Sequence, residues 1–144
     1  MHSVLIRCGS IETVMFVALL TCVGCSNAPV PASGIVQYEN GEPISGAIRV
    51  IRFEPAKEST AEIRKVASSE INQDGSFDLM TYKPGDGAFR GDYIVTLTVL
   101  ESPITGKSLI PAKYTHREST PLKVTVDGAK SDYRFEIAPL KSSR

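Results

Sequence analysis

The side chains best suited to covalent, redox or metal chemistry in this chain are its three cysteines and two histidines. All the cysteines, Cys8, Cys22 and Cys25, lie near the amino terminus, and none follows Cys25. A disulfide framework needs cysteine pairs distributed through the domain, so this distribution excludes one. Cys22 and Cys25 form a C-x-x-C pair, a pattern shared by zinc sites and thioredoxin-like redox centres.

The surroundings of the C-x-x-C pair argue against both of these chemistries. A structural zinc site needs two further ligands, and the only histidines are His2 and His116. A thioredoxin-like centre needs a helix directly after the pair, whereas Pro29 and Pro31 follow here. Zinc and redox chemistry remain the alternatives, but the apolar run in front of the pair indicates a different role.

The segment before Cys25 has the composition of a secretory signal peptide. Arg7 and the amino terminus supply positive charge, and an apolar stretch runs from Val14 to Val23. About ten apolar residues are too few to span a bilayer but suit the hydrophobic region of a signal peptide. A buried or amphipathic helix is the alternative, but residues 14–20 lack polar positions at helical spacing.

The residues around Cys25 resemble a bacterial lipobox, in which an invariant cysteine is diacylated on sulfur and becomes the new amino terminus. Val23 and Gly24 match the positions before that cysteine, and Ser26 follows it. The resemblance implies a lipoprotein signal peptide over residues 1–24 and lipidation at Cys25. Stable anchoring needs more than one acyl chain, and a lipidated amino-terminal cysteine carries several.

Two residues depart from the lipobox pattern. Cys22 stands where leucine is usual, and Glu12 places a negative charge in front of the apolar run. With Cys22 as the lipid acceptor, Thr21 would occupy a position that is usually Gly, Ala or Ser. The resemblance therefore favours Cys25 as the acceptor.

The elements that must position any further functional side chain are strands. The period of the apolar residues changes to two after a Pro-rich tether over residues 25–33, as in half-buried strands. The expected strands cover residues 34–39, 47–55, 62–71, 76–80, 91–100, 121–128 and 131–137. About seven short strands with turns between them predict an all-β fold, a single antiparallel β-sandwich over residues 34–140, followed by a tail at 141–144.

The order of the motifs resembles a known family. GIVQYENGEPISGAIRVIRFEP (residues 34–55) is similar to the opening of carboxypeptidase regulatory-like, or transthyretin-like (prealbumin-like), domains. NQDGSFDL (72–79) and GAFRGDYIVTLTV (87–99) resemble a hairpin and a strand of the same domains. Residues 110–137 are similar to the closing part of small lipoproteins of planctomycete-type bacteria. These motifs are turns and core positions, so the resemblance implies a fold and no particular activity.

Composition and motifs argue against several functions. The 16 basic and 16 acidic side chains cancel, which leaves no electrostatic footprint for nucleic acid or for an anionic membrane. The hydroxyisourate hydrolases of the transthyretin-like fold would need paired histidines and a carboxy-terminal Tyr-Arg-Gly-Ser, whereas this chain ends in APLKSSR. Asp74, Asp78 and Asp86 lack the spacing of an EF-hand loop. We expect neither a cofactor nor a metal.

The candidate contact region is the long polar connection over residues 101–120, because long connections are often functional. The side chains in it that suit a protein or glycan partner are Lys113, Tyr114, His116 and Arg117. The alternative is structural, with Ile110 and Tyr114 pinning the connection to the edge of the sandwich.

The expected function is that of a non-enzymatic protein of the cell envelope, anchored to a membrane by lipid, whose sandwich is a binding or structural module. One alternative is an accessory subunit of an envelope complex, docked through Thr96 and Thr98 on the outer face of the strand over residues 91–100. The other alternative is a small hydrolase with His116 as its base.

Overall fold

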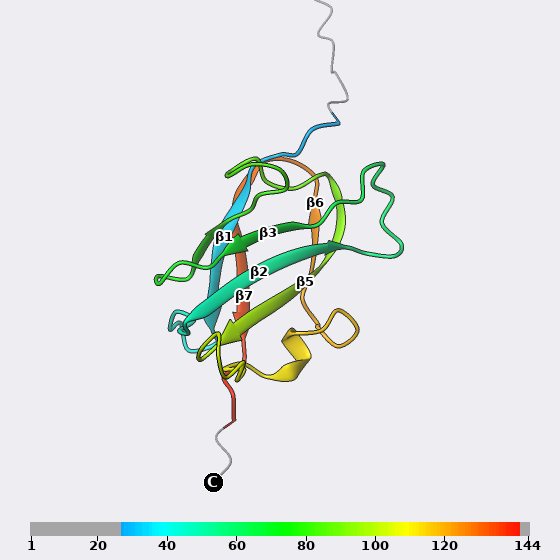
Figure 1. The fold of residues 1–144 in the computed structure, drawn as a ribbon. Helices are drawn as coiled ribbons and strands as arrows, with labels where there is room; N and C mark the ends of the chain where they lie inside the picture. Colours follow the sequence, from blue (N-terminus) through cyan, green and yellow to red (C-terminus); the bar gives the residue numbers. More distant parts are fainter. Residues whose placement is uncertain (1–26, 142–144) are drawn as a thin grey trace, which may run out of the picture.

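The computed structural model describes residues 27–141, and these form two β-sheets packed face to face (Figure 1). The strands are β1 (Ala32–Tyr38), β2 (Ile48–Pro55), β3 (Ala67–Glu70), β4 (Ser76–Asp78), β5 (Gly91–Leu100), β6 (Lys123–Val126) and β7 (Lys130–Ile137). A 3₁₀ turn, η1 (Ala112–Tyr114), lies between β5 and β6, and the described residues contain no α-helix. The prediction of an all-β sandwich with about seven strands is confirmed.

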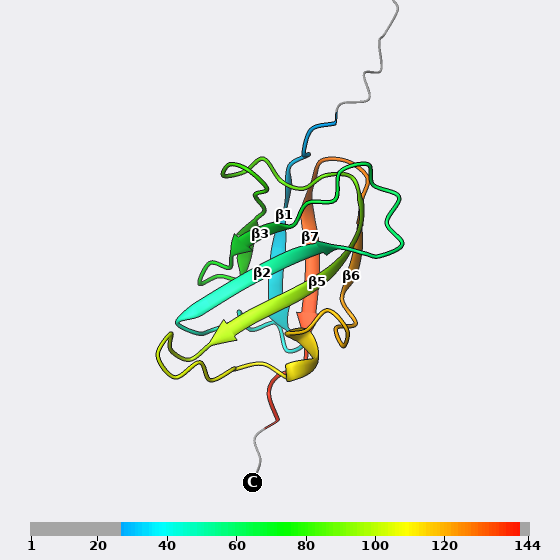
Figure 2. The ribbon, with the colours of Figure 1, turned by 45° about the vertical axis from the view of Figure 1, so that its right-hand side comes forward.

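The two sheets have different sizes. One contains three strands in the order β4-β1-β7, and the other contains four in the order β3-β2-β5-β6 (Figure 2). Every pair is antiparallel except β1 and β7, which run parallel. The expected all-antiparallel arrangement is therefore wrong for this pair. Parallel pairing is possible because β1 and β7 are the first and last strands, so the rest of the fold connects them.

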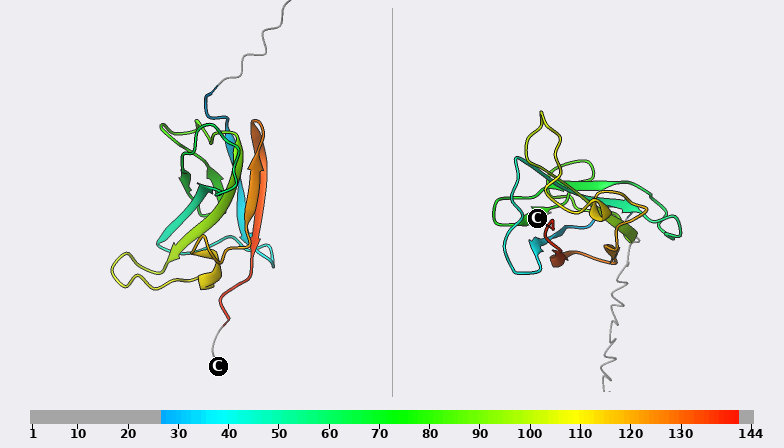
Figure 3. Two further views of the ribbon diagram at one scale, coloured as in Figure 1. Left: turned by 90° about the vertical axis from the view of Figure 1, so that its right-hand side faces the viewer. Right: turned by 90° about the horizontal axis from the view of Figure 1, so that it is seen from below.

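The two sheets face each other (Figure 3), and the buried side chains of the core follow the alternation of the sequence. Phe53 of β2 is fully buried at the centre of the core. Its ring centroid lies 5.8–6.3 Å from those of four other aromatic residues, Phe77, Tyr93, Tyr133 and Phe135. Tilted and edge-on aromatic pairs at this separation stabilise a core beyond the effect of burial alone.

The hairpin expected between residues 62–71 and 76–80 is only partly present. The turn at Gly75 and the burial of Phe77 and Leu79 agree with the prediction. However, β3 pairs with β2 and β4 pairs with β1, so the two strands belong to opposite sheets. The two segments remain linked by an isolated bridge between Ser68 and Met80 and by a hydrogen bond of 3.1 Å that Asp78 N–H donates to the Ser69 hydroxyl. The first residues of the expected strand, 62–66, lie outside β3.

The folded domain begins earlier than the predicted boundary at residue 34. Val30 forms a bridge with Ala88 through two backbone hydrogen bonds of 2.8 and 3.0 Å, and β1 begins at Ala32. In the views of Figures 1 and 3 the chain enters the sandwich at one end, and η1 and the connection after β5 lie at the opposite end. The predictions for residues 1–26, including lipidation at Cys25, lie outside the described residues.

Candidate functional site

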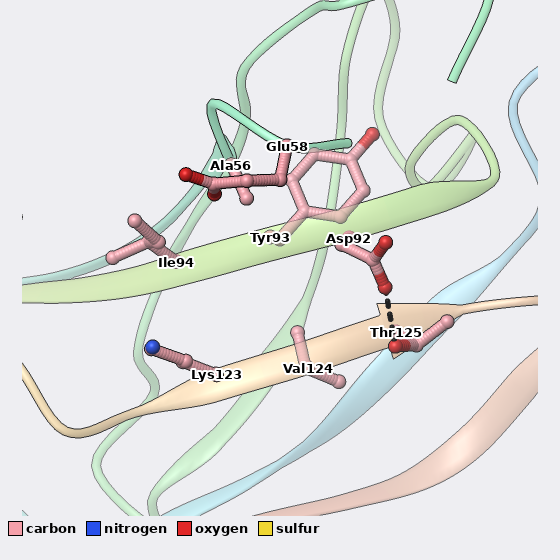
Figure 4. A pocket seen from close by; sticks show the side chains of 8 residues that line it. All are labelled: Ala56, Glu58, Asp92, Tyr93, Ile94, Lys123, Val124 and Thr125. Carbon is pink, nitrogen blue, oxygen red and sulfur yellow. Dashed lines mark hydrogen bonds between the residues drawn. The ribbon is translucent and has the colours of Figure 1, made fainter. Parts of the chain in front are cut away.

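A shallow pocket lies beside the paired parts of β5 and β6, next to the loop that follows β2 (Figure 4). Its volume is about 400 Å³, and it is lined by Ala56, Glu58, Asp92, Tyr93, Ile94, Lys123, Val124 and Thr125. The pairing of β5 with β6 builds most of the pocket. Six of the lining residues are opposite each other in this pairing, as Asp92–Thr125, Tyr93–Val124 and Ile94–Lys123.

The polar groups of the pocket are suited to binding. The Thr125 hydroxyl donates a hydrogen bond of 2.6 Å to Asp92 Oδ1, which holds that carboxylate against β6 (Figure 4). The side chains of Glu58 and Lys123 are exposed and carry opposite charges. Half of the lining residues are charged or polar, namely Glu58, Asp92, Lys123 and Thr125, so the pocket suits a small amphipathic group better than a purely apolar one.

The tyrosine of the pocket is not available for proton transfer near neutral pH. The Tyr93 hydroxyl donates a hydrogen bond of 2.9 Å to the carbonyl oxygen of Phe89. Burial raises the pKa of Tyr93 to about 12, because the charged tyrosinate would be poorly solvated there. The lining contains neither histidine nor cysteine.

The long connection over residues 101–120 is ordered by contacts with the sandwich. Leu109 N–H donates to the Val99 carbonyl oxygen at 2.9 Å, so the chain turns back along β5. Ile110 and Tyr114 are 1% and 3% exposed, and the Tyr114 hydroxyl accepts a hydrogen bond of 3.0 Å from Ala138 N–H. These contacts favour the structural alternative for both residues. Tyr114 belongs to the core and is not an accessible contact for a partner.

Arg117 is also held by the fold. Its guanidinium group lies 3.4 Å from the Glu54 carboxylate and donates a hydrogen bond of 3.2 Å to the Pro55 carbonyl oxygen. The other oxygen of Glu54 accepts a hydrogen bond of 3.1 Å from Thr96, which is 7% exposed. The outer face of β5 is therefore partly covered at Thr96, whereas Thr98 is exposed.

The two remaining residues of the predicted contact cluster lie on the surface. Lys113 is exposed, and its ammonium group lies 4.8 Å from the centroid of the Tyr114 ring. His116 is exposed, and its Nδ1 lies 2.7 Å from the Thr115 hydroxyl and 3.3 Å from the Ala112 carbonyl oxygen. Within residues 27–141, no carboxylate is among the hydrogen-bond partners of this imidazole. The cluster therefore offers a cation and an imidazole at the end of the sandwich away from the tether.

The pocket has no signature in the sequence, because it joins the loop after β2 to two strands about 30 residues apart in the chain. Among the described residues, no group of three or more His, Cys, Asp or Glu side chains is placed to hold a metal ion. No helix in this part of the chain has the length and apolar character needed to cross a membrane. Comparisons with protein-family models, with curated proteins and with solved structures find no match to this chain.

Proposed function

We propose that this chain is a lipid-anchored protein of the cell envelope whose β-sandwich is a non-enzymatic binding module. The observation that carries the proposal is the position of the cysteines. A short apolar stretch ends at Val23-Gly24-Cys25, and no cysteine follows in the sandwich. Lipidation at Cys25 accounts for this position, and it explains how a chain of zero net charge would be held at a membrane.

The geometry of the sandwich supports a binding role for the end opposite the tether. The chain enters the fold at one end, and η1 and the connection after β5 lie at the other (Figure 1). An anchor at Cys25 would therefore turn Lys113 and His116 away from the bilayer, toward a protein or glycan partner.

The anchor is tested by metabolic labelling with an alkyne analogue of palmitate. Cells expressing the full chain, Cys25→Ala or Cys22→Ala are fractionated, and the label on the protein is measured. We expect Cys25→Ala to lose the label and to leave the membrane fraction. Cys22→Ala should keep the label and remain in the membrane fraction. If Cys25→Ala keeps its label and remains in the membrane, lipidation at Cys25 is wrong.

The binding role is tested in the same cells with a photo-crosslinking amino acid at position 113. Position 98 provides a matched control, because Lys113 and Thr98 are both exposed but belong to different elements, η1 and β5. Crosslinked products at 113 and not at 98 support a partner at the end away from the tether. Products at 98 alone would favour the accessory-subunit alternative, docked on the face of β5.

A further inference from the structure

The loop over residues 81–87 follows the bridge at Met80 and lies beside the point where the chain enters the sandwich (Figure 1). Met80 and Tyr82 are 45% and 65% exposed, and Lys83 and Pro84 are also exposed. Met80 and Tyr82 are two positions apart, and neighbouring exposed apolar side chains are a feature of contact surfaces.

The carboxylate of Asp86 holds this loop in one conformation. It accepts hydrogen bonds from the backbone N–H groups of Thr81, Tyr82 and Lys83, at 2.7, 3.0 and 3.2 Å. The Thr81 hydroxyl closes the loop by donating a hydrogen bond of 2.7 Å to the Gly87 carbonyl oxygen. A surface that is ordered in advance loses little conformational entropy when it makes a contact.

The exposed tyrosine is connected to the entry of the chain through packed residues. The Tyr82 ring meets the buried Phe89 ring edge-on, with 5.9 Å between centroids. The residue before Phe89, Ala88, exchanges two backbone hydrogen bonds with Val30. Gly87 lies so close to Val30 that a Cβ atom at position 87 would overlap the Val30 carbonyl oxygen. The loop tip and the start of the domain therefore form one rigid unit.

We propose that Tyr82 and Lys83 contact the headgroup region of the membrane that holds the anchor. The inference rests on the proposed lipidation of Cys25. Val30 lies five positions after Cys25 in the chain. A fully extended chain of about five residues spans at most about 18 Å. Whatever the conformation of these residues, the end of the domain that carries Tyr82 stays near the lipid surface.

The chemistry of the tip suits that surface. Tyrosine is enriched at membrane interfaces, where its ring meets apolar groups and its hydroxyl meets water. Lys83 adds a positive charge that anionic headgroups attract. Contact with the bilayer at Tyr82 and attachment at Cys25 would fix the orientation of the sandwich, with η1 directed outward.

The chain contains no tryptophan, so a single introduced indole can report on this contact. Tyr82→Trp is placed in the full chain, which is purified from membranes and reconstituted into phosphatidylcholine–phosphatidylglycerol vesicles. Ile104→Trp is the matched control, because Ile104 is 94% exposed in the connection after β5, at the other end of the sandwich (Figure 3). Emission is recorded with and without brominated acyl chains, and urea unfolding shows that both variants are folded.

We expect the indole of the Tyr82→Trp protein to emit at shorter wavelength than that of the Ile104→Trp protein, and to be quenched more strongly by brominated lipid. In the Tyr82→Trp background, adding Lys83→Glu should reduce this quenching, and adding Lys113→Glu, at the far end, should leave it unchanged. Equal quenching of the Tyr82→Trp and Ile104→Trp proteins would overturn the inference.

Mass spectrometry of the amino-terminal peptide from the same preparation separates the two proposals. A peptide without acyl groups overturns the anchor itself. An acylated peptide with equal quenching at positions 82 and 104 overturns the membrane contact alone.

Discussion

The hydroxyl of Thr120 donates a hydrogen bond of 2.8 Å to the carbonyl oxygen of Val95. At the start of the β5–β6 pairing, this hydroxyl takes the place of a backbone N–H donor. The same hydroxyl accepts the Leu122 N–H at 3.2 Å, and the Leu122 carbonyl oxygen accepts the Val95 N–H at 2.9 Å. Thr120 is 7% exposed. One buried side chain therefore ends the connection from β5 and starts the edge strand that forms part of the pocket.

Removing this hydroxyl should destabilise the domain. Thr120→Val keeps the shape of the side chain but leaves the Val95 carbonyl and the Leu122 amide without this partner. We expect the free energy of unfolding, measured with urea, to fall by about 1–3 kcal/mol. Thr120→Ser should lower the free energy of unfolding by less. Thr98→Val, at an exposed position of β5, should leave it within about 0.5 kcal/mol of the parent value. Equal values for Thr120→Val and Thr98→Val would contradict this role.

Arg117 and Lys113 should differ in their effect on stability, although the sequence predicts both as contact residues. Arg117→Ala removes an ion pair with Glu54 and a hydrogen bond to the Pro55 carbonyl oxygen. Because these groups are only partly exposed, we expect a loss of about 1 kcal/mol in the free energy of unfolding. Lys113→Ala should be neutral within about 0.5 kcal/mol. If Arg117→Ala leaves the free energy of unfolding unchanged, Arg117 is not held by these contacts and is again a candidate contact for a partner.

The fold could be predicted from the sequence wherever local alternation decides burial. In the strand over residues 91–100 the inward positions match the expectation, and Gly75 has the positive φ, +87°, of the expected turn. The alternation is weaker over residues 62–66. There Arg64 is exposed and donates hydrogen bonds to the carbonyl oxygens of Ala56 and Lys57, so its loop stays outside the sheet. The parallel pairing of β1 with β7 joins the two ends of the domain, and no local pattern predicts it.

The candidate site could be predicted only in part. The length and polarity of residues 101–120 identify the connection, but burial of its members depends on tertiary contacts. Tyr114 contacts Ala138, and Arg117 contacts Glu54. The partners in each pair are far apart in the sequence, and no local pattern in one sequence predicts such contacts. The contact with Glu54 also explains why Thr96 is buried where simple alternation predicts an exposed residue.

Tyr93 should ionise only at strongly alkaline pH. Burial raises its pKa to about 12 from the ordinary value of 10.0. Because the folded state holds this proton more tightly, the contribution of Tyr93 to stability is complete below about pH 10 and is lost as the pH rises toward 12. A titration of tyrosinate absorbance should show a component near 12 that Tyr93→Phe removes. The same component in the Tyr93→Phe protein would assign it to another tyrosine.

Asp86 should make the loop that carries Tyr82 sensitive to acid. Burial by itself would raise the pKa of Asp86, but hydrogen bonds from three backbone amides and the charge of Lys83 lower it below its ordinary value. A lowered pKa in the folded state means that the stabilisation is present above the unfolded pKa of about 3.9 and is lost as the pH falls through the folded value.

Asp86→Asn removes the negative charge that these three amides bind, so we expect it to reduce this acid dependence. Urea unfolding between about pH 5 and about pH 2 should show a smaller loss of stability for Asp86→Asn than for the parent protein. Glu118→Gln, at an exposed position, controls for the change in net charge and should lose as much stability as the parent. In vesicles at neutral pH, adding Asp86→Asn to the Tyr82→Trp protein should also reduce quenching by brominated lipid, because the tip is then less ordered. An acid dependence unchanged by Asp86→Asn would show that the carboxylate does not hold the loop.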